Sequence, residues 1–167
     1  MTHSLDDIDF IEMGRTCLGH AARRTANLLT RHYNRHMSSL GLELTQTQLL
    51  AVIADGSARS ASDIARYLGI DRSTLARNLK PLEAAGLITR QDTGGRKVLP
   101  VLTRAGENKV VEIHQRWEQA QNELSNILGP EGADAVRTHM SALRKAAHIL
   151  EENDGRPTPT GPDDISK

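Results

Sequence analysis

Apolar residues recur at intervals of three and four along most of this chain, and that spacing predicts a mainly α protein. The predicted helices cover residues 10–40, 45–54, 61–68, 72–85, 104–128 and 130–150. Glycine or proline stands at most of the predicted helix ends, and Thr45 is the expected N-cap residue of the second helix. Between the fourth and fifth helices, β-prone residues predict a short hairpin with strands at 87–91 and 97–102.

The two short helices around Gly69, together with the hairpin, form the most informative pattern. Ser60 or Ser62 is suited to cap the first helix of this pair, and Asp71 is suited to cap the second. A tight turn at Gly69 lets the two helices brace each other, and the hairpin that follows has a Gly-Gly tip. This order is typical of a winged helix-turn-helix, in which the second helix enters the major groove of DNA.

Charge is distributed in a way that favours DNA binding, although the formal net charge is zero. Residues 59–104 hold nine lysines and arginines against four acidic residues, while both ends of the chain are acidic. Arginine can fork onto guanine, asparagine can pair with adenine, and hydroxyls can bind bases or phosphates. The residues predicted to contact DNA are Ser60, Ser62, Arg72, Ser73, Thr74, Arg77, Asn78, Lys80, Arg96 and Lys97. For any single residue an ordinary solvated helix face is a competing interpretation, but that interpretation is weak for the whole set.

Composition excludes several other classes of protein. Cys17 is the only cysteine, so no disulfide can form within the chain. No apolar run reaches the roughly 18 residues of a membrane span, and the N-terminus lacks a signal pattern, so a cytoplasmic protein is expected. No phosphate-binding loop, nucleophile elbow or pair of catalytic carboxylates stands out, so neither an enzyme nor a cofactor is expected.

The run IARYLGIDRSTLARNLKPLEAAGLITR at 64–90, the run LTRAG at 102–106 and Trp117 resemble the MarR family of bacterial transcription regulators. In the order of its helices the chain is similar to that family over residues 10–152. The resemblance implies an N-terminal dimerisation helix (10–44), a winged helix-turn-helix DNA-binding domain (45–103) and C-terminal dimerisation helices (104–152). Polar, acidic residues predict a flexible N-terminus (1–9), and a proline-rich segment with few apolar residues predicts a disordered tail (153–167). Many relatives brace the wing arginine with an acid; Arg96 takes the place of that arginine, and whether Asp92 braces it stays open.

The resemblance further implies a homodimer that reads the two half-sites of a palindromic operator in double-stranded DNA and represses transcription until a small-molecule effector binds. In the family, the effector pocket lies where the first, second and fifth helices meet the winged domain. The corresponding candidates are His20, Arg24, His36, Met37, Leu40, His114 and Trp117. Such a lining suits an aromatic carboxylate or a related acyl thioester, while packing in the dimer core is the alternative role for each residue.

An alternative to a ligand-responsive repressor is a thiol-based redox-sensing repressor that acts through Cys17. Some relatives that sense hydroperoxides use a lone cysteine near this position. Tyr33, which could hold the thiolate, lies sixteen residues further along the predicted helix, so the two could meet only across subunits. A buried thiol that merely fills space is the competing interpretation. His32 and His36 share a helix face, but no Cys/His spacing of known metal type is present, so no metal site is expected.

Overall fold

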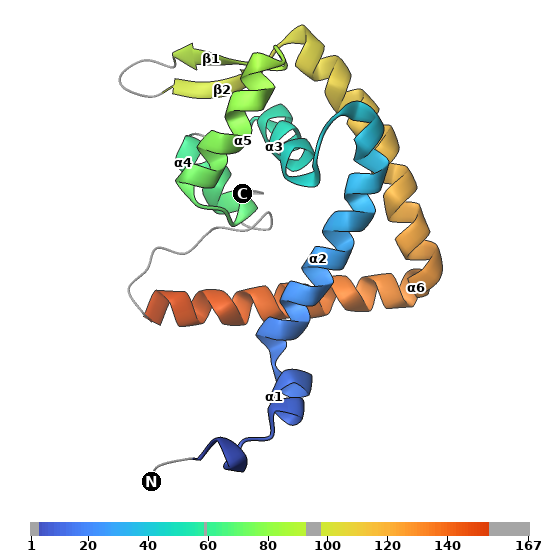
Figure 1. The fold of residues 1–167 in the computed structure, drawn as a ribbon. Helices are drawn as coiled ribbons and strands as arrows, with labels where there is room; N and C mark the ends of the chain where they lie inside the picture. The colour runs from blue at the N-terminus through green and yellow to red at the C-terminus, as the bar shows by residue number, and fades with distance from the viewer. Residues whose placement is uncertain (1–3, 59, 93–97, 154–167) are drawn as a thin grey trace.

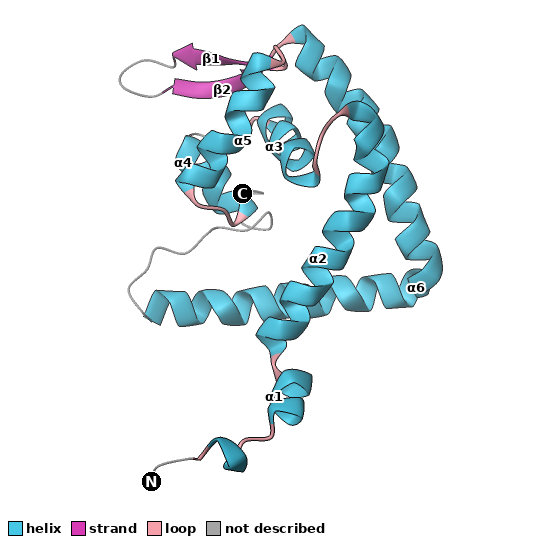
Figure 2. Ribbon diagram, viewed as in Figure 1, coloured by secondary structure: helices cyan, strands magenta, loops and turns pink. Residues whose placement is uncertain are grey.

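The computed structural model describes residues 4–58, 60–92 and 98–153, and within them long helices dominate (Figure 1). The elements are η1 (Leu5–Asp7), α1 (Phe10–Thr16), α2 (Leu18–Met37), η2 (Ser38–Leu40), α3 (Leu44–Asp55), α4 (Ala61–Leu68), α5 (Arg72–Ala84), β1 (Ile88–Asp92), β2 (Val98–Leu102) and α6 (Arg104–Asn153). Helices α3, α4 and α5 gather with the hairpin into one compact unit, and α2 and α6 extend from it as arms (Figure 2). The mainly α, winged helix-turn-helix fold is therefore confirmed.

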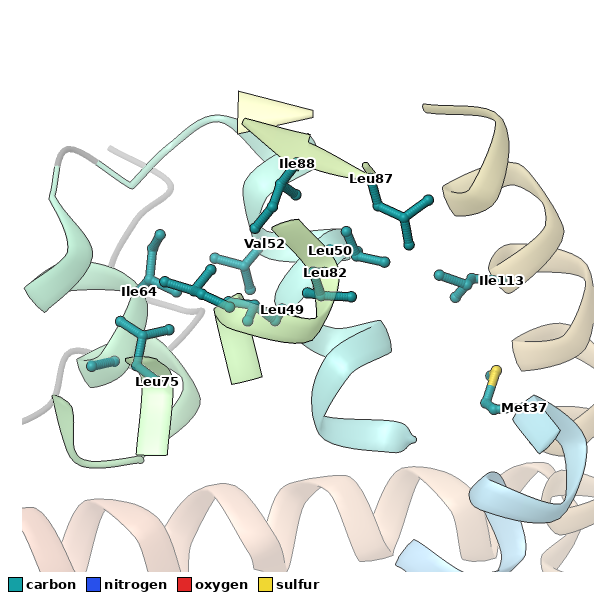
Figure 3. Close-up of a cluster of buried hydrophobic side chains, with 12 residues drawn as sticks. Met37, Leu49, Leu50, Val52, Ile64, Leu75, Leu82, Leu87, Ile88 and Ile113 are labelled. Atoms are coloured by element: carbon teal, nitrogen blue, oxygen red, sulfur yellow. The ribbon is translucent and has the colours of Figure 1, made fainter. Parts of the chain in front are cut away.

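The core of the winged unit is built from apolar side chains that α3, α4 and α5 bring together (Figure 3). Leu49 and Leu50 of α3 are fully buried, and Leu82 of α5 packs in the same cluster. Burying one such side chain stabilises the fold by about 1.5–3 kcal/mol. Met37 of α2 and Ile113 of α6 belong to this cluster as well, so both arms are packed onto the winged unit.

The hairpin is fastened to the first turn of α6. The two strands pair antiparallel, and the residue after them, Thr103, donates its backbone N–H to the carbonyl of Leu87 at 3.0 Å. The Thr103 hydroxyl donates to the carbonyl of Gly86 at 2.6 Å and accepts the N–H of Gly106 at 3.1 Å. A Cβ atom at Gly106 would lie 2.0 Å from the Leu87 oxygen, so only glycine fits there without a shift of backbone. The LTRAG run, residues 102–106, therefore connects the hairpin to the first turn of α6 through these hydrogen bonds.

Two expectations for the N-terminal half are wrong. The predicted helix over 10–40 is broken at Cys17, which has an extended backbone and caps α2 through its sulfur, and the helix gives way to η2 after Met37. Glycines on both sides of Cys17, at 14 and 19, weaken the helix there. Thr45 is not an N-cap residue.

Helix α3 begins at Leu44, one position before the predicted start at residue 45, and Glu43 is its N-cap residue. The Gln46 side chain accepts the N–H of Glu43 at 2.9 Å, and Asn34 of α2 accepts the N–H of Leu44 at 2.6 Å. These two bonds satisfy N–H groups that a helix start leaves open, so the preceding arm helps to set where α3 begins.

Other helix ends agree with the sequence. Ser60 caps α4 and Asp71 caps α5, and Gly69 between them has a φ of 63°. Gly129 has a φ of 71° and kinks α6. The parts of α6 before and after Gly129 therefore run in different directions (Figure 1). Pro81 lies inside α5, which continues beyond it to Ala84. Among the described residues, no helix is both long and apolar enough to cross a membrane.

Candidate nucleic-acid interface and effector cavity

Helix α5 is the element that sequence analysis assigns to the major groove, and its first turn is organised by Asp71. The Asp71 carboxylate accepts the Thr74 N–H at 2.8 Å and the Thr74 hydroxyl at 2.7 Å, and it also accepts the hydroxyl of Ser73. These bonds, the one from Ser73 above all, hold the pKa of Asp71 well below its usual range. The cap therefore stays charged at neutral pH and fixes the end of the helix that would meet DNA.

The solvent-facing surface of α5 carries Ser73, Ala76, Arg77 and Lys80, all of them exposed. Arg77 donates to the Thr74 hydroxyl at 3.1 Å, which holds the guanidinium beside the first turn. Ala76 was not among the predicted contact residues, although its position between Ser73 and Lys80 on the same face indicates that it is exposed. A small side chain there leaves room for a close approach to a groove floor.

Two other predicted contact residues of α5, Arg72 and Asn78, differ from each other in exposure and in hydrogen bonding. Arg72 is exposed and lines a shallow groove of about 210 Å³ between α5 and the hairpin, beside Arg90 and Pro100. Asn78 is half-buried and donates its amide to the carbonyl of Thr74 at 2.9 Å. Asn78 and Thr74 would have to exchange these internal hydrogen bonds for contacts to DNA.

The serines before and within α4 are engaged or partly covered. Ser60 accepts the N–H of Asp63 at 3.1 Å and donates to its carboxylate at 2.8 Å, so its hydroxyl already serves the helix cap. Ser62 is half-buried. The geometry thus gives Ser60 a structural task beside the predicted contact with DNA.

The wing is braced at its base by an ion pair that sequence analysis did not identify. Arg90 of β1 donates to both carboxylate oxygens of Glu83 on α5, at 2.5 and 3.2 Å. The hydrogen bond from Arg90 lowers the pKa of Glu83, so the pair stays charged at neutral pH. Arg96 and Lys97 lie outside the described residues, as does the side chain of Asp92.

A second site lies away from this surface, where α2, α3 and α6 meet. These helices enclose a cavity of about 720 Å³, within the range of small-molecule sites. The cavity is lined by Ala26, Leu29, Thr30, Tyr33, Met37, Leu44, Thr47, Gln48, Ala51, Val110, Ile113, His114 and Trp117. Burial raises the pKa of Tyr33, whose hydroxyl donates to Gln121 of α6 at 2.7 Å. Of the predicted pocket residues, Met37, His114 and Trp117 line this cavity.

The remaining predicted pocket residues lie elsewhere. His20 and Arg24 line a separate recess of about 390 Å³ along α2, together with Arg23 and Arg31. His36 contacts Glu123 of α6, and Leu40 packs against the hydrophobic core. The helix period explains the difference, because His20 and Arg24 project from a different face of α2 than Leu29 and Tyr33.

Cys17 is exposed and is not the buried thiol that the space-filling interpretation requires. Its sulfur accepts the N–H of His20 at 3.4 Å, at the first turn of α2. Tyr33 is bonded to Gln121, so within one chain the tyrosine does not hold the thiol.

The capped helix pair, the braced hairpin and the packed helical arms define a winged helix-turn-helix protein. A model of the MarR family matches residues 40–97. The chain is 28% identical over 106 residues to the uncharacterized HTH-type transcriptional regulator YwoH of Bacillus subtilis, covering 63% of this chain and 77% of YwoH.

Solved structures agree with this likeness. The transcriptional regulator MosR of Mycobacterium tuberculosis in complex with DNA has a TM-score of 0.71 and 28% identity, over 80% of this chain and 98% of MosR. The repressor CouR bound to p-coumaroyl-CoA has a TM-score of 0.71 and 21% identity, over 81% of this chain and 96% of CouR, which shows the fold. Residues 40–97 therefore match the MarR family of transcriptional regulators, and the named relatives of this chain are transcriptional regulators.

Proposed function

We propose that the protein is a homodimeric repressor that binds a palindromic operator through α5 and leaves it when a small acyl or aromatic-acid ligand fills the cavity. The observation that supports this proposal is the position of the cavity beside α3. Helix α3 lines the cavity with Leu44, Thr47 and Ala51 and packs its opposite side against α4, α5 and β2. A ligand wedged between α3 and α6 therefore presses on the element that supports the DNA-reading helix.

The cavity lining favours a ligand with an apolar body. Among the described residues of the lining, none is lysine or arginine, and the polar groups are hydroxyls, an amide, the indole N–H of Trp117 and the imidazole of His114. An aromatic or acyl group would lie against Leu29, Ile113 and Trp117, with any anionic end at the rim beside exposed His114. CouR, a structural neighbour of the same fold, binds p-coumaroyl-CoA, which supports an acyl thioester as the ligand class.

The test of the proposed function is DNA binding by the purified protein to its own upstream region at two salt concentrations. Arg77→Ala should weaken binding to that DNA by about 1–3 kcal/mol, because a guanidinium on the exposed face of α5 can contact a base edge. Arg116→Ala is the matched control: Arg116 is exposed on α6 and contacts Gln119. Equal losses in both variants would mean that only overall charge matters, and no loss in Arg77→Ala would remove Arg77 from the interface.

A thiol switch at Cys17 is the second candidate, favoured by the exposure of its sulfur at the first turn of α2. Peroxide would then release the protein from DNA, and Cys17→Ser would abolish that release without changing DNA affinity under reducing conditions. Release by peroxide that persists in Cys17→Ser excludes this mechanism.

A further inference from the structure

Two histidines of α2 and a glutamate of α6 form a cluster that the DNA-binding surface and the cavity do not use. His36 Nε2 lies 3.1 Å from Glu123 Oε2, and His32 Nδ1 lies 3.9 Å from the same oxygen. One donor atom from each of the three residues lies within 4.8 Å of the other two. The helix period places the two histidines on one face of α2, and Glu123 of α6 is the third group, which no local spacing indicates.

The tautomer of His32 is fixed by its surroundings. His32 Nε2 lies 3.0 Å from the carbonyl oxygen of Ala120, which can only accept, so this nitrogen carries the proton. Arg35, which can only donate, reaches Nδ1 at 3.3 Å, consistent with a lone pair on that nitrogen. A carbonyl that holds one ring nitrogen while the other binds a metal is the usual arrangement around histidine ligands.

Burial and spacing suit a small divalent cation. The side chains of His32 and His36 are 13% and 18% exposed, and Glu123 is 58% exposed, so the cluster is reachable from one side. Metal–ligand bonds of about 2.0–2.1 Å in a tetrahedron place neighbouring donor atoms about 3.3 Å apart. The observed 3.1 and 3.9 Å lie on either side of that value, and all three donor atoms lie within 4.8 Å of one another, so side-chain rotations would have to bring them closer to one ion.

We propose that His32, His36 and Glu123 bind one divalent transition-metal ion of the Zn²⁺ class, with water in the fourth position. The ion would replace the proton between His36 and Glu123 and would displace the Arg35 guanidinium from His32. It would join two segments that are 87 residues apart in sequence, and so fix α2 against α6. Tyr33, the residue after His32, lines the cavity, so the metal site would lie beside the cavity wall.

The test is titration of the chelator-treated full-length protein with Zn²⁺ by calorimetry and with Co²⁺ by visible absorption, which reports tetrahedral coordination. We expect one ion per chain and a higher melting temperature with Zn²⁺, because the site exists only in the folded chain. His36→Ala and Glu123→Gln should each weaken binding by at least about tenfold and abolish the rise in melting temperature. Arg35→Ala should tighten binding, since it removes the competing donor.

His139→Ala is the control, because His139 contacts a carbonyl within its own helix and should leave the affinity unchanged. Circular dichroism checks that each variant folds, and Glu123→Gln keeps an oxygen that can still accept from His36. No binding by the wild-type chain, or equal binding by the wild type and both ligand variants, would overturn the metal site. The readouts require no DNA, so the metal site and the proposed repressor function can fail separately.

Discussion

Asp71 shows how one carboxylate can hold the DNA-reading helix in place. Its folded pKa lies well below the ordinary value of 3.8, so the charged cap stabilises the fold above about pH 4. That stabilisation is lost as the pH falls through the folded pKa. Asp71→Asn keeps a capping side chain but removes the charge, so it should be less stable than the wild type at pH 7 in urea unfolding. The difference should shrink steadily below pH 4, and a difference that is independent of pH would show that the charge is unimportant.

Gly106 makes a second prediction for a single position. A methyl group there meets the carbonyl of Leu87 at 2.0 Å, and backbone on the wing must move to admit it. Gly106→Ala should therefore destabilise the fold by about 1–3 kcal/mol in urea unfolding. Gly132→Ala is the matched control, because its nearest contact would be Leu128 Cβ at an ordinary 3.5 Å. In the helix this control should be neutral or stabilising by about 0.5–1 kcal/mol, since alanine restricts the unfolded chain.

The helices and their ends were largely predictable from sequence because their signals are local. Ser60 and Asp71 are each followed within a turn by the N–H group that they accept, so spacing identifies Asp71 and narrows the cap of α4 to Ser60 or Ser62. The prediction of Thr45 as an N-cap residue was wrong because Asn34 of α2 accepts the N–H of Leu44 and so helps to set the start of α3. The break at Cys17 was also missed, although Gly14 and Gly19 flank it.

The sites were less predictable, because they depend on how one helix is rotated against another. The apolar stripe of α2 indicates a buried face, but it does not say which residues of α6 lie opposite. Tyr33 meets Gln121 and His36 meets Glu123 across 88 and 87 residues, and nothing local encodes either pairing. For this reason only three of the predicted pocket residues line the cavity, while His20 and Arg24 face a different recess.

The cavity between α2, α3 and α6 can be tested through the chain's single tryptophan. Trp117 lines the cavity and is 43% exposed, so a bound aromatic acyl ligand should change its fluorescence. Ala51→Phe places a ring in the cavity from α3 and should weaken ligand binding about tenfold or more, because the ring occupies ligand volume. DNA binding without ligand should persist in Ala51→Phe. Full ligand affinity in this variant would show that the ligand binds elsewhere.

In the part of the chain that the structure describes, the basic winged unit is separate from the exposed apolar side chains of α1 and of the last part of α6, and this division supports a dimer. Large apolar side chains are exposed on α1 and on the last part of α6, including Ile11 at 78% and Ile149 at 58%. Exposed apolar surface of this extent usually marks an interface. A second copy of the chain would cover it and would set two α5 helices at the spacing of two half-sites.

The paired substitution Ile11→Glu with Ile149→Glu tests this arrangement. Both side chains are exposed in the single chain, so the charges should leave its helical content intact, yet they should oppose burial in an interface. Sedimentation equilibrium should show a dimer for the wild type and a monomer for the variant. Val111→Glu is the control, because Val111 is 61% exposed on the part of α6 nearer the wing. Affinity for the full palindrome should fall in the paired variant toward that for a single half-site, because only a dimer binds both half-sites at once; a variant that stays dimeric would place the interface elsewhere.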